Sequence, residues 1–350
     1  MPTMPDYAGG RVPIILDVDT GIDDSLALLY ACASAEVELV GVGCTAGNID
    51  ARQVAENTRA VLELAGRDGV EVSLGREAPL VRDLVTAPET HGPRGIGYAV
   101  LPAASMRLSP RHSADMIAEE AARRPGEVTL VTLGPLTNAA VAVLRHPDLP
   151  VHLRRLVIMG GSYRSPGNTA PTSEWNVAVD PEAARVVFRA FGDRDVQAAR
   201  KAHGLAPRPL ALGLDVTERA KLTPDHLEQL AHRAGADSLA SPPGANPIVR
   251  YLRAALGFYM EFHSRYDGFY GAFIHDPLAL AAALDPGLVR SEALAVDVEL
   301  GGSLTAGETV TDWRRAWGRP ANLDIAVEAD IPAFLERFIE RVGALAAERG

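Results

Sequence analysis

Short apolar runs alternate with stretches of helical spacing along almost the whole chain. The first apolar run, at 12–16, ends in carboxylates and is followed by helical spacing at 25–33. A second run at 38–43 precedes helical spacing at 50–64. Repeated strand–helix–strand units place parallel strands side by side, with ligand sites beyond their carboxyl ends. The pattern therefore predicts an α/β fold, in which an open, mostly parallel, twisted sheet carries helices on both faces in a Rossmann-like arrangement.

The later part of the chain continues this alternation and then adds β-rich sequence. Helices are predicted at 114–123, 136–144, 225–233 and 247–265, and strands at 128–133, 156–159 and 210–214. Three further β-rich runs, at 294–298, 308–313 and 323–327, precede a final helix from 331 to about 347. Residues 192–209 are polar, contain prolines and show no clear period, which indicates a surface insertion at about 193–209. We expect one domain over 1–350, with a core at about 12–345 and extra C-terminal strands.

Composition narrows the class of protein. The chain has 350 residues, 47% of them hydrophobic, which is enough to bury a large core without disulfides. The net charge is −11 and the only lysines are Lys201 and Lys221, so no nucleic-acid surface is expected. No apolar stretch reaches the roughly 20 residues of a membrane span, and residues 1–10 carry no targeting pattern. With only Cys32 and Cys44 as cysteines, we predict a cytoplasmic protein from a reducing compartment.

Four carboxylates lie within eight residues directly after the first apolar run, in the sequence Asp-Val-Asp-Thr-Gly-Ile-Asp-Asp. Strand alternation places Asp17 and Asp19 on one side, and Gly21 lets the backbone turn so that Asp23 or Asp24 also faces that side. Carboxylates this close repel one another unless a cation lies between them, and a many-oxygen site suits Ca²⁺ better than Mg²⁺. The alternative is that Asp23 or Asp24 only caps the next helix, but four carboxylates exceed what a cap needs.

Other polar clusters follow later strands and are individually less specific. His275-Asp276-Pro277 can open a helix, or His275 can protonate a leaving group while Asp276 reaches a metal; taken alone, the capping interpretation is stronger. Residues 168–176 contain amides and acids that suit the recognition of hydroxyl groups, although such loops are usually solvated turns. Asn48 and His91 are weak candidates by themselves for the same reason.

Taken together and in this order, the motifs resemble the inosine–uridine-preferring nucleoside hydrolase family. The resemblance runs from residue 12 to about 340. It rests on the acidic motif at 17–24, Ala-Gly-Asn at 46–48, Gly-Pro-Leu-Thr-Asn at 134–138, Met-Gly-Gly at 159–161, Glu-Trp-Asn at 174–176, Gly-Leu-Asp-Val-Thr at 213–217 and His-Asp-Pro-Leu-Ala at 275–279. The acidic motif is highly specific at this position, and the other motifs gain weight from their order.

The resemblance implies a role for each matching position. Ca²⁺ would be held by Asp19, Asp24 and Asp276 and by the backbone carbonyl of Leu133. The ribose hydroxyls would be bound by Asp23, Asn48, Asn168, Glu174 and Asn176, with Met159 close by. Asp19 would be the general base, His275 the proton donor to the departing base, and His91 a mobile-loop histidine near the base. Trp175 stands where the family commonly has phenylalanine, which keeps an aromatic wall but changes its size.

The implied reaction is hydrolysis of the N-glycosidic bond of ribonucleosides to free base and ribose, by a calcium-bound water that Asp19 activates. Bond cleavage builds positive charge on the ribosyl group, which carboxylates and amide oxygens stabilise, and inversion at the anomeric carbon is expected. Purine-specific relatives carry tryptophan where this chain has His275, so we expect a broad or pyrimidine-tolerant specificity. The aromatic loop with Tyr266, Phe269 and Tyr270 either closes over the base or only packs. A homodimer or homotetramer is also implied.

Two other functions fit part of the sequence. Asp17-Val18-Asp19 after a strand also resembles a haloacid-dehalogenase-type phosphatase, in which the first aspartate is a nucleophile and Mg²⁺ the cofactor. That fold needs a lysine near the phosphate, and the chain offers only two. An inactive nucleoside-binding protein is disfavoured by the complete set of acids, amides and histidines. The product separates the two enzymes, since one releases ribose from a nucleoside and the other releases phosphate from a phosphomonoester.

Overall fold

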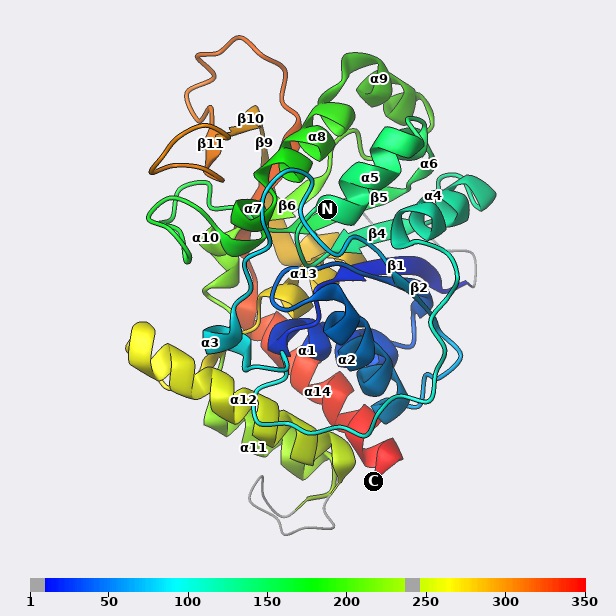
Figure 1. Ribbon diagram of the computed structural model, residues 1–350, viewed down its shortest axis with the longest axis vertical. Helices are drawn as coiled ribbons and strands as arrows, with labels where there is room; N and C mark the ends of the chain where they lie inside the picture. Colours follow the sequence, from blue (N-terminus) through cyan, green and yellow to red (C-terminus); the bar gives the residue numbers. More distant parts are fainter. Residues whose placement is uncertain (1–9, 237–245) are drawn as a thin grey trace.

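The computed structural model describes residues 10–236 and 246–350, and one eight-stranded sheet forms its centre (Figure 1). In spatial order the strands are β3 (Glu71–Leu74), β2 (Val37–Cys44), β1 (Val12–Val18), β4 (Thr129–Thr132), β5 (Arg155–Met159), β6 (Leu210–Leu212), β12 (Leu323–Ala329) and β9 (Val289–Leu294). Neighbouring strands pair in parallel except β9 and β12, which are antiparallel. The predicted α/β class with a mostly parallel sheet is therefore confirmed.

The order of the strands places a switch point between β1 and β4. From β1 the chain moves outward to β2 and β3, and then crosses back to continue through β4, β5 and β6 on the other side. The loops that follow β1 and β4 therefore run in opposite directions and leave a crevice beyond the carboxyl ends of these two strands. The acidic motif follows β1, so the topology itself places the four carboxylates at this crevice.

Helices cover both faces of the sheet, because successive strand residues point to opposite sides. In β1, Ile14 and Leu16 belong to one hydrophobic cluster and Ile15 belongs to the other. The first cluster receives α1 (Ile22–Ala33), α2 (Ala51–Leu64), α11 (Pro224–Arg233), α12 (Pro247–Tyr266), α13 (His275–Leu284) and α14 (Ile331–Arg349). The second receives α4 (Ser113–Arg123), α5 (Thr137–Arg145), α6 (Leu149–His152) and α8 (Pro181–Gly192).

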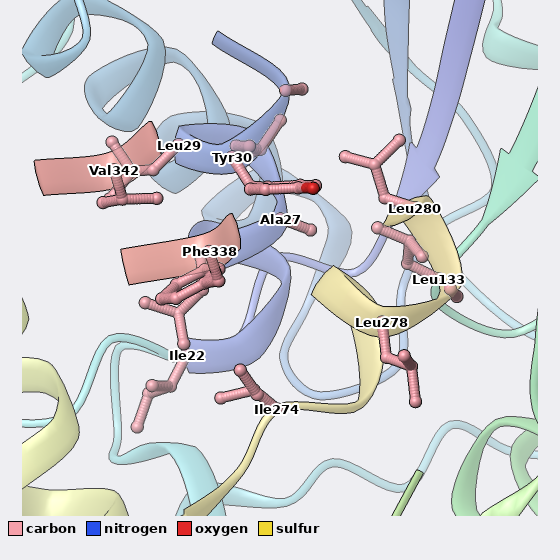
Figure 2. Packing of buried hydrophobic residues seen from close by; sticks show 14 of the residues in the cluster. Ile22, Ala27, Leu29, Tyr30, Leu133, Ile274, Leu278, Leu280, Phe338 and Val342 are labelled. Atoms are coloured by element: carbon pink, nitrogen blue, oxygen red, sulfur yellow. The ribbon is translucent and has the colours of Figure 1, made fainter. Parts of the chain in front are cut away.

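The core around α1 fixes the helix that carries two of the acidic residues. Every residue of α1 except its last is buried, in keeping with its almost wholly apolar sequence. Figure 2 shows α1 between α13 and α14, with Tyr30 and Phe338 among the packed side chains. Their rings stack with centroids 5.9 Å apart, and the Phe334 ring meets Tyr30 edge-on at 6.5 Å. This packing holds the first turn of α1 in place at the end of β1.

The segment at 193–209 differs from the predicted irregular insertion. It contains a helix, α9 (Arg194–Ala202), whose Arg200 is fully buried. The guanidinium group of Arg200 donates hydrogen bonds to the carbonyl groups of Pro150, Leu153, Arg154 and Ala206. The inward-facing position of α9 is thus occupied by an arginine, so the sequence lacks the hydrophobic period by which a helix is recognised.

Several other boundaries shift, and some elements were not predicted. The run at 294–298 divides between the end of β9 and β10 (Val296–Val298), which pairs with β11 (Thr309–Thr311) in a separate antiparallel hairpin. The predicted strand at 210–214 ends at Leu212 and leads into α10 (Leu214–Thr217). The further elements that were not predicted are β3, α6, α8, α3 (Pro88–His91), α7 (Trp175–Val179), the paired β7 (Lys221–Leu222) and β8 (Ala272–Phe273), and the 3-10 helix Pro286–Leu288.

In 10–236 and 246–350, no helix has the length and apolar character needed to cross a membrane. Residues 1–9, where no targeting pattern was expected, lie outside the described part of the chain.

Phe338→Ala should lower the free energy of unfolding by about 3–5 kcal/mol, because it leaves a cavity against Tyr30 and Phe334. Urea denaturation followed by circular dichroism measures this change. Val100→Ala is the matched control, since Val100 is 79% exposed and its loss should change the free energy of unfolding by less than about 0.5 kcal/mol. Equal effects of the two substitutions would contradict the packing described for α1 and α14.

Candidate active site

Asp19 follows β1, and its carboxylate packs against two glycine residues, Gly47 and Gly134. Its Oδ2 accepts a hydrogen bond of 2.7 Å from the backbone N–H of Asn48. A Cβ atom added to Gly47 would lie 2.1 Å from Oδ2, and one added to Gly134 would lie 2.7 Å from Oδ1. The glycines of the motifs at 46–48 and 134–138 are therefore required by the close approach of the Asp19 carboxylate.

Asp24 joins the acidic loop to the first turn of α1. Its Oδ2 accepts hydrogen bonds from the backbone N–H of Gly21 at 2.9 Å and from Nδ2 of Asn48 at 3.3 Å. Its Oδ1 accepts from the backbone N–H of Asp19 at 3.1 Å. Asp24 thus caps the N-terminus of α1, as the helix-capping interpretation predicted. The acidic loop has a second feature, because Asp23 and Asp276 gather beside Asp24.

Asp23, Asp24 and Asp276 form the carboxylate group that could hold a metal ion. Their ligand oxygens lie within 4.8 Å of one another, and all three side chains are buried. Burial, and then the neighbouring charge of Asp24, raises the pKa of Asp19 and of Asp23 well above the ordinary value. The pKa of Asp276 is raised well above its ordinary value by burial and by the charge of Asp23. Like charges held this way fit a divalent cation.

The predicted ligand set overlaps this group without matching it. Asp24 and Asp276 are members of the group, whereas Asp23, predicted as a ribose ligand, takes the third place. Asp19 lies beside them, and its Oδ1 is buried without a hydrogen-bond partner, which leaves a free lone pair at the cluster. The carbonyl oxygen of Leu133 accepts a hydrogen bond of 2.7 Å from Nδ2 of Asn176 and keeps a second lone pair. These donors are all oxygens, as a hard cation requires.

Asp17 lies outside the metal-binding group, although it was expected on the same side as Asp19. Its Oδ1 accepts a hydrogen bond of 2.8 Å from Nδ2 of Asn138 in α5. The same amide group of Asn138 reaches the carbonyl of Cys44 at 3.2 Å, and its oxygen accepts from the backbone N–H of Arg76 at 2.8 Å. Burial raises the pKa of Asp17 to about 7. The hydrogen-bonded pair of Asp17 and Asn138 therefore connects β1 with the end of β2 and with the loop after β3.

One cavity of about 490 Å³ opens beside the cluster and brings the predicted residues together. All eight positions predicted to bind substrate line it, together with Leu133, His275 and Asp276. These eight are Asp23, Asn48, His91, Met159, Asn168, Glu174, Trp175 and Asn176. Asp19 and Asp24 are not in the lining and lie directly behind it, since both are bonded to Asn48. The volume is within the usual range for small-molecule sites.

The loop at 168–176 is held by its own polar side chains. Glu174 caps α7, with Oε1 accepting from the backbone N–H of Asn176 at 2.8 Å and Oε2 accepting from that of Gly161 at 2.8 Å. Oδ1 of Asn168 accepts from the backbone N–H of Trp175 at 3.0 Å. Some of the polar groups that the sequence offers for hydroxyl recognition are therefore used to hold the loop in shape, while the residues that carry them line the cavity.

Two predicted histidines also line the cavity. Nδ1 of His91 accepts a hydrogen bond of 3.1 Å from the backbone N–H of Ile22. Nδ1 of His275 lies 2.8 Å from Oγ1 of Thr217, whose hydroxyl group donates to the carbonyl of Gly213 at 3.2 Å. Burial lowers the pKa of His91 and of His275 to about 3. Both rings are therefore neutral at pH 7, and His275 donates its Nδ1 hydrogen to Thr217.

Sequence reasoning missed most of the lining that α12 contributes. Tyr259, Phe262, His263 and Tyr266 all line the cavity, and of these only Tyr266 was a candidate. Their spacing of three and four residues, which places them on one face of a helix, was a signal that could have found them. Phe269 and Tyr270, the other aromatic candidates, are absent from the lining. Glu218, Asp267 and Phe273 complete this end and carried no signal in the sequence.

The sequence profile of the inosine-uridine preferring nucleoside hydrolases matches residues 14–336. The chain belongs to this family. It is 34% identical over 332 residues to the pyrimidine-specific ribonucleoside hydrolase RihA of Photobacterium profundum, covering 94% of this chain and 98% of that protein. It is 33% identical over 335 residues to the inosine-uridine preferring nucleoside hydrolase of Leishmania major, covering 94% and 98%.

Solved structures agree with the family. A purine-preferring ribonucleoside hydrolase from Gardnerella vaginalis matches with a TM-score of 0.84 at 29% identity, over 96% of this chain and 99% of that one. The predicted class of enzyme, a hydrolase of N-glycosyl bonds in ribonucleosides, is confirmed by the family and by these structures. Family membership also decides against the phosphatase interpretation of the acidic motif.

Asp276→Asn should raise the melting temperature in a chelating buffer and lower it, relative to the unmutated protein, when a divalent cation is present. Without a cation, ionised buried carboxylates destabilise the folded state, so removing one charge relieves repulsion. With cation at 100 times its Kd, binding adds about 2.7 kcal/mol to the unmutated protein only. Thermal unfolding monitored by fluorescence measures both conditions.

The same pKa shifts fix a pH dependence for the chelated protein. Because these carboxyl groups hold protons in the folded state that the unfolded state has released, stability falls as the pH rises above about 4.

Asp225→Asn, at an exposed position in α11, is the control for the cation experiment with Asp276→Asn. Melting temperatures of the Asp276 and Asp225 variants that respond alike to cation would argue against a metal site here.

Proposed function

We propose that this enzyme hydrolyses the N-glycosidic bond of ribonucleosides with Asp19 as the general base and Ca²⁺ as the cofactor. The single observation that carries the proposal is the buried Oδ1 of Asp19, which lacks a hydrogen-bond partner beside a cluster of like charges. A buried carboxylate oxygen left without a donor is costly, so its retention points to a ligand that the reaction supplies.

Asp19, Asp24, Asp276 and the carbonyl of Leu133 would hold the cation. All of these donors are oxygens, and Ca²⁺ accepts about six to eight oxygen ligands in a flexible geometry, whereas Mg²⁺ demands a near-ideal octahedron and keeps several water molecules, which favours Ca²⁺. A bound divalent cation lowers the pKa of a coordinated water molecule and fixes its position. Asp19 can then accept the proton at Oδ1, since Oδ2 is already occupied by the N–H of Asn48.

The ribose end of the cavity suits a transition state in which the sugar becomes positive. Asp23 and Glu174 offer carboxylate oxygens, and Asn48, Asn168 and Asn176 offer amide groups in the lining. Negative charge placed beforehand around a developing cation lowers the barrier without reorganisation at the moment of reaction. Removal of this charge should therefore affect kcat more than KM.

His275 is positioned to act on the departing base. Because Thr217 accepts the Nδ1 hydrogen of His275, the ring keeps its lone pair on Nε2, and the residue lines the cavity. Only the protonated ring can donate from Nε2, and with a pKa of about 3 that form is scarce at pH 7. The proton-donor contribution should thus lie near the lower limit of general-acid catalysis, about 10²-fold.

We propose a specificity that tolerates pyrimidines, because His275 stands where purine-specific relatives carry tryptophan. The names of the related proteins include both pyrimidine-specific and purine-preferring hydrolases, so they do not select one base. The proposed partner is a small ribonucleoside. A cytoplasmic location and a homodimer or homotetramer remain predictions.

Assays of free ribose released from uridine, cytidine, inosine and adenosine test the function directly. Turnover should require Ca²⁺, disappear with a chelator and return when Ca²⁺ is added in excess. Asp19→Asn should lower kcat by about 10²–10⁴-fold while the protein remains folded, because the base is lost but its shape is kept. Asp225→Asn serves as the control for a remote carboxylate.

Full turnover of every nucleoside by the Asp19 variant would remove Asp19 as the base. Absence of ribose release from all four nucleosides by the unmutated protein with Ca²⁺ would instead support the inactive nucleoside-binding alternative.

His275→Ala should slow cleavage of uridine by about 10²-fold, and should slow cleavage of p-nitrophenyl riboside much less. The phenolate of the second substrate leaves without a proton, so it does not need a donor. Comparison of kcat for the two substrates in both proteins measures the effect. An equal loss on both substrates would indicate that His275 only supports the structure of the cavity.

A further inference from the structure

One part of the cavity lining is built from aromatic rings and negatively charged side chains. We call this the base end, and it consists of Glu218, Tyr259, Phe262, His263, Tyr266, Asp267 and Phe273. No lysine or arginine occurs among the described residues that line the cavity. A ligand group with negative charge would find no partner here, whereas a positive group would be surrounded by favourable contacts.

The rings of the base end are arranged around His263. The ring centroid of Tyr259 lies 4.5 Å from that of His263, and the Phe273 ring meets His263 edge-on at 4.7 Å. Phe262 lies on a third side at 5.4 Å. The faces of such rings carry negative quadrupole charge and bind cations within about 6 Å of the centroid. The aromatic lining therefore adds to the negative potential of the carboxylates.

Glu218 and Asp267, the two carboxylates of the base end, lie close enough for their charges to interact. Oδ2 of Asp267 lies 2.7 Å from Nδ1 of His263. Burial raises the pKa of Glu218, and the charges of Asp267 and Asp215 raise it further, although Lys221 acts in the opposite direction. Glu218 is thus near enough to Asp267 to be affected by its charge. A cation placed between the rings would relieve this repulsion.

His263 adds a hydrogen-bond acceptor to the base end, its Nε2 atom. With Nδ1 paired to Asp267, the neutral ring carries its lone pair on Nε2, and this atom is buried without a hydrogen-bond partner. Burial lowers the pKa of His263, which keeps the ring neutral despite Asp267. His263 therefore donates from Nδ1 to Asp267 and leaves Nε2 as a buried hydrogen-bond acceptor beside the two carboxylates.

The rings beside the cavity already bind one cation. Nζ of Lys221 lies 4.6 Å from the ring centroid of Phe269 and 5.6 Å from that of Phe273. Lys221 is exposed and does not line the cavity, so it leaves the lining face of Phe273 to a ligand.

We propose that the base end selects ribonucleosides whose base carries a permanent positive charge, as in N-ribosylpyridinium compounds. This inference rests on the proposed function and names a substrate class for the same site. Water attacks the anomeric carbon, the carbon–nitrogen bond breaks, and its electron pair neutralises the pyridinium nitrogen. The attacking water gives up one proton, and the products are ribose and a neutral pyridine. The departing base needs no proton, so this substrate class does not depend on a general acid.

The test compares kcat/KM for N-ribosyl-3-carbamoylpyridinium with kcat/KM for uridine in each protein. Comparing the ratio of the two values between a variant and the unmutated protein cancels the intrinsic reactivity of the substrates. Glu218→Gln, which removes one charge at nearly constant shape, should lower this ratio about tenfold, and adding Asp267→Asn should lower it further. Glu218→Asp, which keeps the charge, should retain most of the ratio. Glu336→Gln, at an exposed position in α14 away from the cavity lining, should leave the ratio at the unmutated value.

A ratio that stays within twofold of the unmutated value in both Glu218→Gln and the double variant would overturn the proposal. Failure of the unmutated protein to cleave the pyridinium nucleoside while it cleaves uridine would also overturn it. If neither uridine nor the pyridinium compound is cleaved, the proposed function itself fails, which separates the two results. Melting temperatures of the variants show that each remains folded.

Discussion

Repulsion among buried carboxylates at the ends of β1 and β4 is the constraint on which the rest of the structure depends. Asp23 and Asp24 come from the first turn of α1, and Asp276 comes from the first turn of α13. In solution these groups would separate, because the charge of Asp24 raises the pKa of Asp23, and the charges of Asp23 and Asp24 raise the pKa of Asp276. They stay together because α1 and α13 are packed among buried apolar side chains, so that moving one carboxylate would disturb the core. The stability of the core thus keeps the three carboxylates assembled.

The polypeptide around the carboxylates is shaped by contacts between distant segments. Thr309, from the hairpin of β10 and β11, donates to the carbonyl of Ser162 at 2.7 Å and accepts from its N–H at 3.1 Å. Nε1 of Trp313 donates to the carbonyl of Tyr163 at 2.9 Å. The extra C-terminal strands therefore support the loop that carries Asn168 and Glu174. Since sugar recognition requires fixed oxygen positions, these bonds connect the C-terminal part of the fold to the ribose end of the cavity.

The two ends of the cavity differ in what they require of the ligand. In the proposed reaction, the carboxylates of the ribose end would be close to the place where the sugar becomes positive, so they would favour the transition state over the bound nucleoside. The rings and carboxylates of the base end would act on the bound base as well as on the transition state, so we propose that they govern which base is accepted. His275 lies between these ends, with Nδ1 held by Thr217 and its ring 5.7 Å from that of Phe273. The residues proposed for the reaction and those proposed for selecting the base are therefore neighbours, but they can be substituted separately.

The sequence by itself determined the fold class, the acidic motif and the positions that gather around the ribose end, because those residues directly follow strands or open helices. Parallel strands bring their carboxyl ends to one edge, so local position predicts proximity there. Tertiary structure alone decided the rest. His263 and Asp267 lie one turn apart at the end of α12, and only the packing of α12 brings them to one cavity with Glu218. It also decided that Asp17 pairs with Asn138 and that the segment around Arg200 is helical, since buried polar contacts leave no hydrophobic period to read.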